Sequence, residues 1–192
     1  MFPCGFCCSR TVSPGDCMSL GETVVYYLLI FTVAIVGGVC EDFICDTFNI
    51  KEQPNYAGAD GHHIKLIDNP NATDPTYQEL INFIAADSTD QKRYEKGVYV
   101  CSDYAEDIHN NAEAAGIKAA WVSVDFEDEC VGHACNAFNT TDKGLVFIDC
   151  TESDSWAHCE IGEEYQPYAL DFDISYTYYI SMGVVSDIGI YW

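Results

Sequence analysis

Hydrophobic and polar positions divide the chain into two unlike parts. From Thr23 to Val39, seventeen uncharged and mostly apolar residues follow one another without a break. Beyond about residue 60, short apolar pieces alternate with polar turns. The first pattern is near the lower length limit of a membrane-spanning helix, and the second is typical of the helices and strands of a globular domain. We therefore expect an N-terminal span followed by one folded domain.

Two segments of this domain have apolar residues at helical spacing. The first predicts a helix over residues 75–87, with Asp74 as its N-cap. The second predicts a helix that begins at Ser102 or Asp103 and stops before Gly116, a residue type that commonly ends helices.

Alternating apolar and polar residues predict several strands. One covers residues 63–67 and another covers residues 117–126. Two more, over residues 132–138 and 144–149, flank a five-residue loop of turn formers, which is typical of a hairpin. The tail over residues 160–192 is rich in aromatic and β-branched residues and predicts two or three further strands. The expected fold class is α+β, with helices packed on an antiparallel sheet.

The predicted hairpin brings a histidine and a carboxylate together. If Phe138 pairs with Gly144, His133 lies directly opposite Asp149, and the Cβ atoms of directly opposed residues are about 5 Å apart. An imidazole and a carboxylate at this separation can form a hydrogen bond. The bond would fix the ring tautomer and leave the other nitrogen for a thiol.

A candidate thiol lies where a short apolar strand turns into the second helix. Cys101 ends the strand that begins at Val98, so it lies at a helix N-terminus. Backbone N–H groups and the helix dipole favour the nucleophilic thiolate at this position. The alternative is a buried cysteine that only fills space, and the histidine and carboxylate further along the chain favour the nucleophile. His109 lies off the apolar stripe of this helix and is expected at the surface.

Four short motifs resemble those of the transglutaminase-like superfamily: Cys101-Ser-Asp-Tyr-Ala105, Ala115-Gly-Ile117, His133-Ala-Cys-Asn136 and Ile148-Asp-Cys-Thr151. The resemblance covers roughly residues 63–165. It implies a papain-like fold, in which a helix-borne cysteine packs against an antiparallel sheet. It also implies that Cys101 is the nucleophile, His133 the general base and then acid, and Asp149 the residue that orients His133.

The resemblance implies acyl transfer. A thiolate attacks an amide carbonyl, the histidine protonates the leaving nitrogen, and water or an amine resolves the thioester. Single-domain prokaryotic-type members more often use water, so we expect a peptidase or amidase that acts on protein or peptide amides without a cofactor. A cross-linking acyltransferase is the other outcome.

Two other classes of function remain open. One is a membrane-anchored binding or structural module that keeps the same fold without turnover. The other is a zinc-binding domain whose ligands would be Cys130, His133, Cys135 and either His158 or Cys159.

The 11 cysteines favour an exported domain. Four precede the apolar run, and of the seven that follow it Cys101 is the candidate nucleophile. The remaining six are an even number, as expected for a disulfide-bearing domain with one reactive thiol. Cys135 and Cys150 replace an aromatic residue and a proline that are common in the family, which fits a disulfide.

Charge and the apolar run suggest where the domain resides. Eight Lys and Arg against 31 Asp and Glu give a net charge of −23, which disfavours nucleic acid as a partner and leaves divalent cations as candidates for the acidic surface. Arg10 precedes the run and acidic residues follow it, which indicates a cytoplasmic N-terminus. We expect a cytoplasmic segment over 1–21, a single-pass membrane anchor over 22–40, a linker over 41–62 and the transglutaminase-like domain outside the cell over 63–192. Secretion after cleavage of a signal peptide is the alternative.

Overall fold

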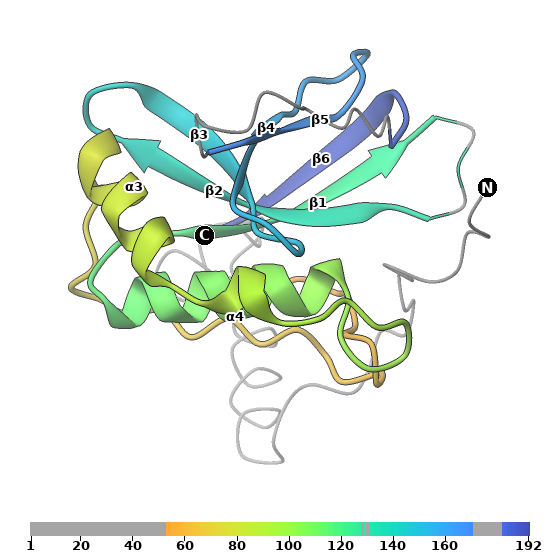
Figure 1. Cartoon of the computed structure of the whole chain (residues 1–192), viewed down its shortest axis with the longest axis horizontal. Coiled ribbons are helices and arrows are strands. Elements are labelled where there is room, and N and C mark those ends of the chain that lie inside the picture. Colours follow the sequence, from red (N-terminus) through yellow and green to blue (C-terminus); the bar gives the residue numbers. More distant parts are fainter. Residues whose placement is uncertain (1–52, 128, 130, 171–181) are drawn as a thin grey trace, which may run out of the picture. The chain divides into compact units, whose positions relative to one another are not determined.

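The computed structural model describes residues 53–127, 129, 131–170 and 182–192. Within these residues, a curled antiparallel sheet and two α-helices form a mixed α+β fold, with α4 lying along one face of the sheet (Figure 1). The expected α+β class is confirmed. The strand order is β5-β4-β3-β2-β1-β6. The elements in chain order are α3 (Tyr77–Ala86), η1 (Thr89–Gln91), α4 (Cys101–Ala114), β1 (Ala120–Phe126), β2 (His133–Thr140), β3 (Gly144–Asp149), β4 (Ser155–His158), β5 (Gln166–Ala169) and β6 (Val185–Tyr191).

Helix α3 starts later than the predicted Asp74 cap. Its N-cap is Thr76, whose hydroxyl accepts from the Glu79 N–H at 3.3 Å, while the Glu79 carboxylate accepts from the Thr76 N–H at 2.7 Å. This reciprocal capping box satisfies two backbone donors that the helix itself leaves without acceptors. Asp74 instead accepts a hydrogen bond from Asn139 Nδ2 at 3.0 Å. The cap prediction was wrong because a threonine two residues later can form the complete box.

Helix α4 begins at Cys101 itself. The Asp103 carboxylate accepts from the Val100 N–H at 2.8 Å, and this bond starts the helix one or two residues earlier than predicted. The helix ends at Ala114, and Gly116 adopts a φ of +82°, which glycine tolerates without steric strain. The predicted end is therefore confirmed, and Cys101 occupies the first helical position.

Hairpin β2–β3 has a different register from the predicted one. Thr140, rather than Phe138, pairs with Gly144, so the loop between the strands has three residues instead of five. The predicted pairing is wrong by two positions. Because side chains alternate between faces along a strand, a shift of two leaves every side chain on its original face. His133 and Asp149 therefore still share a face, as diagonal instead of directly opposed neighbours.

The two faces of the sheet bury different sets of residues. On the side of α4, Ala134 belongs to the same buried cluster as Cys101 and Ala105. On the opposite side, Cys135 belongs to a cluster with Tyr165 and other apolar residues, which the curled sheet encloses. Each large apolar side chain buried in these clusters contributes about 1.5–3 kcal/mol to stability.

Residues 63–67 do not form the predicted strand. They alternate between exposed and buried side chains, as expected, and Ile64 and Leu66 are the buried ones. Their backbone N–H groups, however, donate to side chains of α4: Lys65 to Glu106 at 3.1 Å and Ile67 to Asn110 at 2.8 Å. An extended segment beside a helix thus has the same hydrophobic alternation as an edge strand. Strand β4, in contrast, was not predicted.

The predicted membrane anchor over residues 22–40 lies outside the described residues, as do residues 1–21 and 41–52. None of the helices within the described ranges is both long enough and apolar enough to cross a membrane. From Gln53 onward, the described residues belong to one compact unit. Residues 53–62, expected as the end of a linker, therefore pack with the domain.

Candidate active site

His133 and Asp149 form a buried hydrogen-bonded pair. His133 is the first residue of β2 and Asp149 is the last residue of β3. The distance from His133 Nε2 to Asp149 Oδ2 is 2.7 Å, and the two side chains are only 4% and 7% exposed. Because the carboxylate engages Nε2, ring nitrogen Nδ1 is left for a second partner. The structure thus brings this predicted pair together despite the different register.

Two further groups hold the Asp149 carboxylate. The hydroxyl of Tyr165 donates to Oδ2 at 2.9 Å, and the Thr151 N–H donates to Oδ1 at 3.0 Å. Tyr165 is fully buried, and its ring packs edge-on against the His133 ring with the centroids 5.2 Å apart. Both oxygens of the carboxylate are therefore fixed. Tyr165 was not predicted as part of the site, because in the sequence one tyrosine of an aromatic-rich tail is indistinguishable from a core residue.

The electrostatics of the pair favour an imidazolium beside a carboxylate. Burial lowers the pKa of His133, but the charges of Asp149 and Cys101 and hydrogen bonds to both side chains raise it well above its usual value. Burial raises the pKa of Asp149, whereas the charge and hydrogen bond of His133 and the bonds from Thr151 bring it below its usual value. A raised pKa for the histidine and a lowered pKa for the aspartate are the shifts expected of a stabilised ion pair.

Cys101 is the third member of the group. It is fully buried at the N-terminus of α4, and its charge and a side-chain hydrogen bond between it and His133 both contribute to the raised pKa of that histidine. The structure therefore brings together all three residues that the sequence analysis selected. They come from α4, β2 and β3, with His133 in contact with both of the others.

The other described cysteines are in environments that keep them protonated. Burial raises the pKa of Cys135 and of Cys150 well above the usual value, and it raises the pKa of Cys159 to about 12. All three are free thiols. The disulfide suggested for Cys135 and Cys150 is absent, because the two residues lie in separate core clusters. Among the described cysteines, Cys101 alone has an imidazole partner that would stabilise a thiolate.

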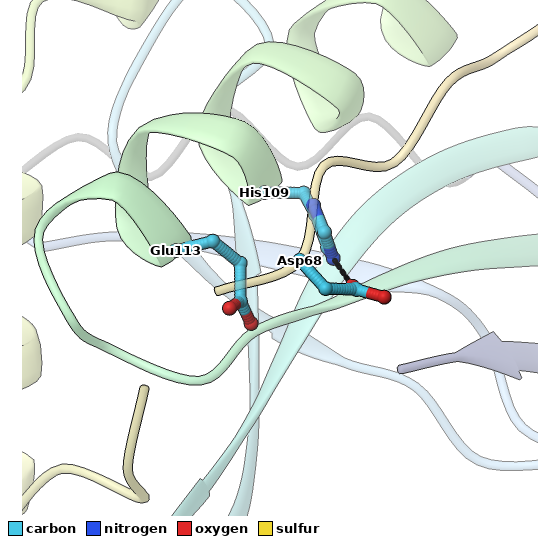
Figure 2. Close-up of side chains that lie close together, drawn as sticks. All are labelled: Asp68, His109 and Glu113. Carbon is cyan, nitrogen blue, oxygen red and sulfur yellow. Dashed lines mark ion pairs between the residues drawn. The ribbon is translucent and has the colours of Figure 1, made fainter. Parts of the chain in front are cut away.

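Neither group of potential metal ligands in the described residues contains His133 or Cys135. Asp68, His109 and Glu113 form one of these groups (Figure 2), and His158, Glu160 and Glu163 form the other. Cys130, a ligand of the alternative zinc site, lies outside the described residues.

His109 is fully buried, so its predicted position at the surface is wrong. It is covered by the extended segment that follows residue 53, whose Asp68 forms an ion pair with it at 3.7 Å. The apolar periodicity of α4 gives no sign of this cover, because polar side chains of the helix accept hydrogen bonds from its backbone.

Comparisons with protein-family models, with curated proteins and with solved structures give no match for this chain.

Proposed function

We propose that the protein is a transglutaminase-like cysteine acyl-transfer enzyme, most simply a peptidase or amidase. One observation carries the proposal: His133 hydrogen-bonds to Asp149 through Nε2 at 2.7 Å and also interacts with Cys101. A thiol at a helix N-terminus, an imidazole and an orienting carboxylate are the parts that nucleophilic acyl transfer requires. The family resemblance of the surrounding motifs and a helix-borne cysteine on an antiparallel sheet support the same proposal.

In the first step, the Cys101 thiolate attacks the carbonyl carbon of an amide. A C–S bond forms, and negative charge develops on the carbonyl oxygen. The backbone N–H of Cys101, in the first turn of α4, is the donor that we assign to this oxygen. The His133 imidazolium then gives its proton to the amide nitrogen, the C–N bond breaks, and the amine leaves.

In the second step, the neutral His133 removes a proton from water as the water attacks the thioester. The C–S bond breaks, the carboxylic acid is released, and the Cys101 thiolate and the His133 imidazolium are restored, which closes the cycle. If a primary amine enters in place of water, the same step makes a new amide. Asp149 stays ionised throughout and stabilises the imidazolium, while Tyr165 acts as a positioning residue that keeps Oδ2 directed at His133.

The remaining expectations belong to the same proposal. The run over residues 22–40 would anchor the protein, and the domain over residues 63–192 would face the outside of the cell, with protein or peptide amides as substrates. A non-catalytic module with the same fold is the competing class, and turnover distinguishes the two.

The test is to incubate the full-length protein with a peptide library, with and without an amine donor, and to analyse the products by mass spectrometry. We expect cleavage or deamidation in the wild type and its loss in Cys101→Ala, while a matched variant of a protonated thiol, Cys159→Ala, keeps activity. Cross-linking to the donor would identify the acyltransferase. Equal product from Cys101→Ala and wild type would overturn the proposal.

A further inference from the structure

A strap of residues 56–69 lies along α4 and covers the start of this helix (orange to yellow in Figure 1). Tyr56, Ile64 and Leu66 are buried with Cys101 in one hydrophobic cluster. The carbonyl oxygen of Ala57 accepts a hydrogen bond from the Ser102 hydroxyl at 3.2 Å, one residue from the nucleophile. The strap therefore packs around the position of Cys101.

Hydrogen bonds hold the strap to one face of α4. Backbone N–H groups of Ala59, Lys65, Ile67 and Asn69 donate to side chains at helix positions 103, 106, 110 and 113, over distances of 2.8–3.1 Å. These four positions are spaced by three, four and three residues, so they form a single stripe. Figure 2 shows the far end of the strap, where Asp68 faces His109 and Glu113.

The strap is held differently from the core. Few of its side chains are buried, and the hydrogen bonds that join its backbone to α4 lie at a partly exposed surface. Segments with few apolar contacts and exposed hydrogen bonds open at lower free energy than the rest of a domain. In contrast, Cys101 is fully buried, and His133 and Asp149 are 3% and 5% exposed. A peptide amide cannot reach the thiol while the strap is in place.

We infer that the strap is a cover that gates the active site: the described structure is the closed form, and Cys101 reacts only when residues 56–69 leave α4. The inference rests on the proposed function, because a cover regulates only a thiol that has chemistry to perform. Opening breaks contacts to the Asp103, Glu106, Asn110 and Glu113 side chains and leaves the sheet, with His133 and Asp149, unchanged.

The test uses two double variants of the full-length protein at neighbouring positions of α4. One removes four hydrogen bonds to the strap and the bond between His109 and Asn110, and the other removes four hydrogen bonds to other residues. Glu106→Ala with Asn110→Ala removes bonds to His62, to Ile67 and two to Lys65, all in the strap. Asp107→Ala with Asn111→Ala removes bonds from the opposite side, to residues Lys92, Tyr99, Asp87 and Thr89. The rate of alkylation by iodoacetamide is measured for each cysteine by peptide mapping.

We expect Cys101 alkylation to accelerate about tenfold or more in the strap variant and to change little in the control, because each lost hydrogen bond shifts local opening by a factor of several. Alkylation of Cys135 and Cys150, which the strap does not cover, should stay at the wild-type rate. An unchanged rate of Cys101 alkylation, or an equal increase in the alkylation rates of all three thiols, would overturn the inference that the strap covers Cys101.

Turnover of the peptide library separates this inference from the proposed function. Fast, selective Cys101 labelling in a strap variant that processes no amide would support the cover and overturn acyl transfer. If the wild type processes amides but Cys101 is alkylated at the same rate in the wild type and both double variants, the result would support acyl transfer and overturn the inference that the strap is a cover.

Discussion

The hydroxyl of Tyr165 donates to Asp149 at the same oxygen that His133 engages. Burial and the charge of Asp149 raise the pKa of Tyr165 well above its usual value, so the phenol keeps its proton and remains a donor. A single oxygen thus receives two hydrogen bonds, one from the proposed acid–base group and one from a side chain outside the triad. The loop before β5 is thereby tied to the active site.

Tyr165→Phe should remove this bond without changing the size of the ring. A hydrogen bond to a charged buried group is worth about 1.5–3 kcal/mol, and we expect a loss of that order in the free energy of unfolding near neutral pH. Urea unfolding measures it. Because the pKa of Asp149 is lowered by folding, the contribution is present above about pH 4 and fades as the pH falls through the folded-state value.

Tyr168→Phe is the matched control, since Tyr168 is exposed and its hydroxyl donates to Gln166 at the surface. It should change stability by less than about 0.5 kcal/mol. A Tyr165→Phe protein as stable as this control, at every pH, would contradict the role of the phenol.

His133 should control the reactivity of Cys101 at low pH. Its raised pKa keeps the imidazolium charged around neutral pH, and an imidazolium beside the thiol preserves the thiolate below the ordinary thiol range. In the Glu106→Ala, Asn110→Ala background, where the thiol is reachable, we expect His133→Gln to slow Cys101 alkylation at pH 6 by about tenfold or more. At pH 9 the two rates should converge. Superimposable pH profiles would refute the interaction.

The strap should loosen as His62 loses its proton. The hydrogen bond to Glu106 raises the pKa of His62 from 6.5 to about 9. Burial opposes this rise, and the interaction with Asp60 adds to it. The carboxylate of Asp103 also faces the His62 ring, with Oδ1 3.8 Å from Nε2. Since the folded-state pKa is raised, the stabilisation is complete below pH 6.5 and is lost as the pH rises through 9.

Hydrogen exchange at the Ala59 and Lys65 amides reports this loosening, after correction for the intrinsic rate at each pH. We expect protection to fall between pH 6.5 and pH 9.5, roughly following the His62 titration. In His62→Gln the same amides should show protection that does not vary over this interval. A pH dependence that survives the substitution would assign the effect to another group.

The cap of α3 gives a stability test that is independent of the active site. Thr76→Ala removes the capping box and should lower the free energy of unfolding by about 1 kcal/mol. Asp74→Ala leaves the box intact and should cost less, although the sequence predicted Asp74 as the cap. Denaturant unfolding of both variants decides between the two positions, and a larger loss for Asp74→Ala would contradict the observed cap.

The sequence was most informative where local chemistry decides the outcome. Gly116 ends α4 as predicted, because few other residues adopt its positive φ. His133 and Asp149 share a face because strand periodicity is fixed, so the pair survived an error in the register.

The predictions were wrong where contacts with residues distant in sequence determine the local structure. Residues 63–67 alternate like a strand, but their hydrogen-bond partners are side chains of α4, which periodicity cannot reveal. The same contacts bury His109, which a helical wheel places outside the apolar stripe. Tyr165 reaches Asp149 only through the curl of the sheet, so nothing near it in sequence marks it as part of the site.

Because the β2–β3 loop is short, the effect of an insertion on the site depends on whether it adds an odd or an even number of residues. If an added residue moves β3 by one position against β2, Asp149 turns to the α4 side and Ile148 takes its place beside His133. A displacement by two keeps the carboxylate on the His133 side. Proteins with this hairpin can differ in the length of the loop. Among them, we expect the number of residues between the histidine and the aspartate to change by even numbers, so that it stays odd or stays even, although the number itself varies.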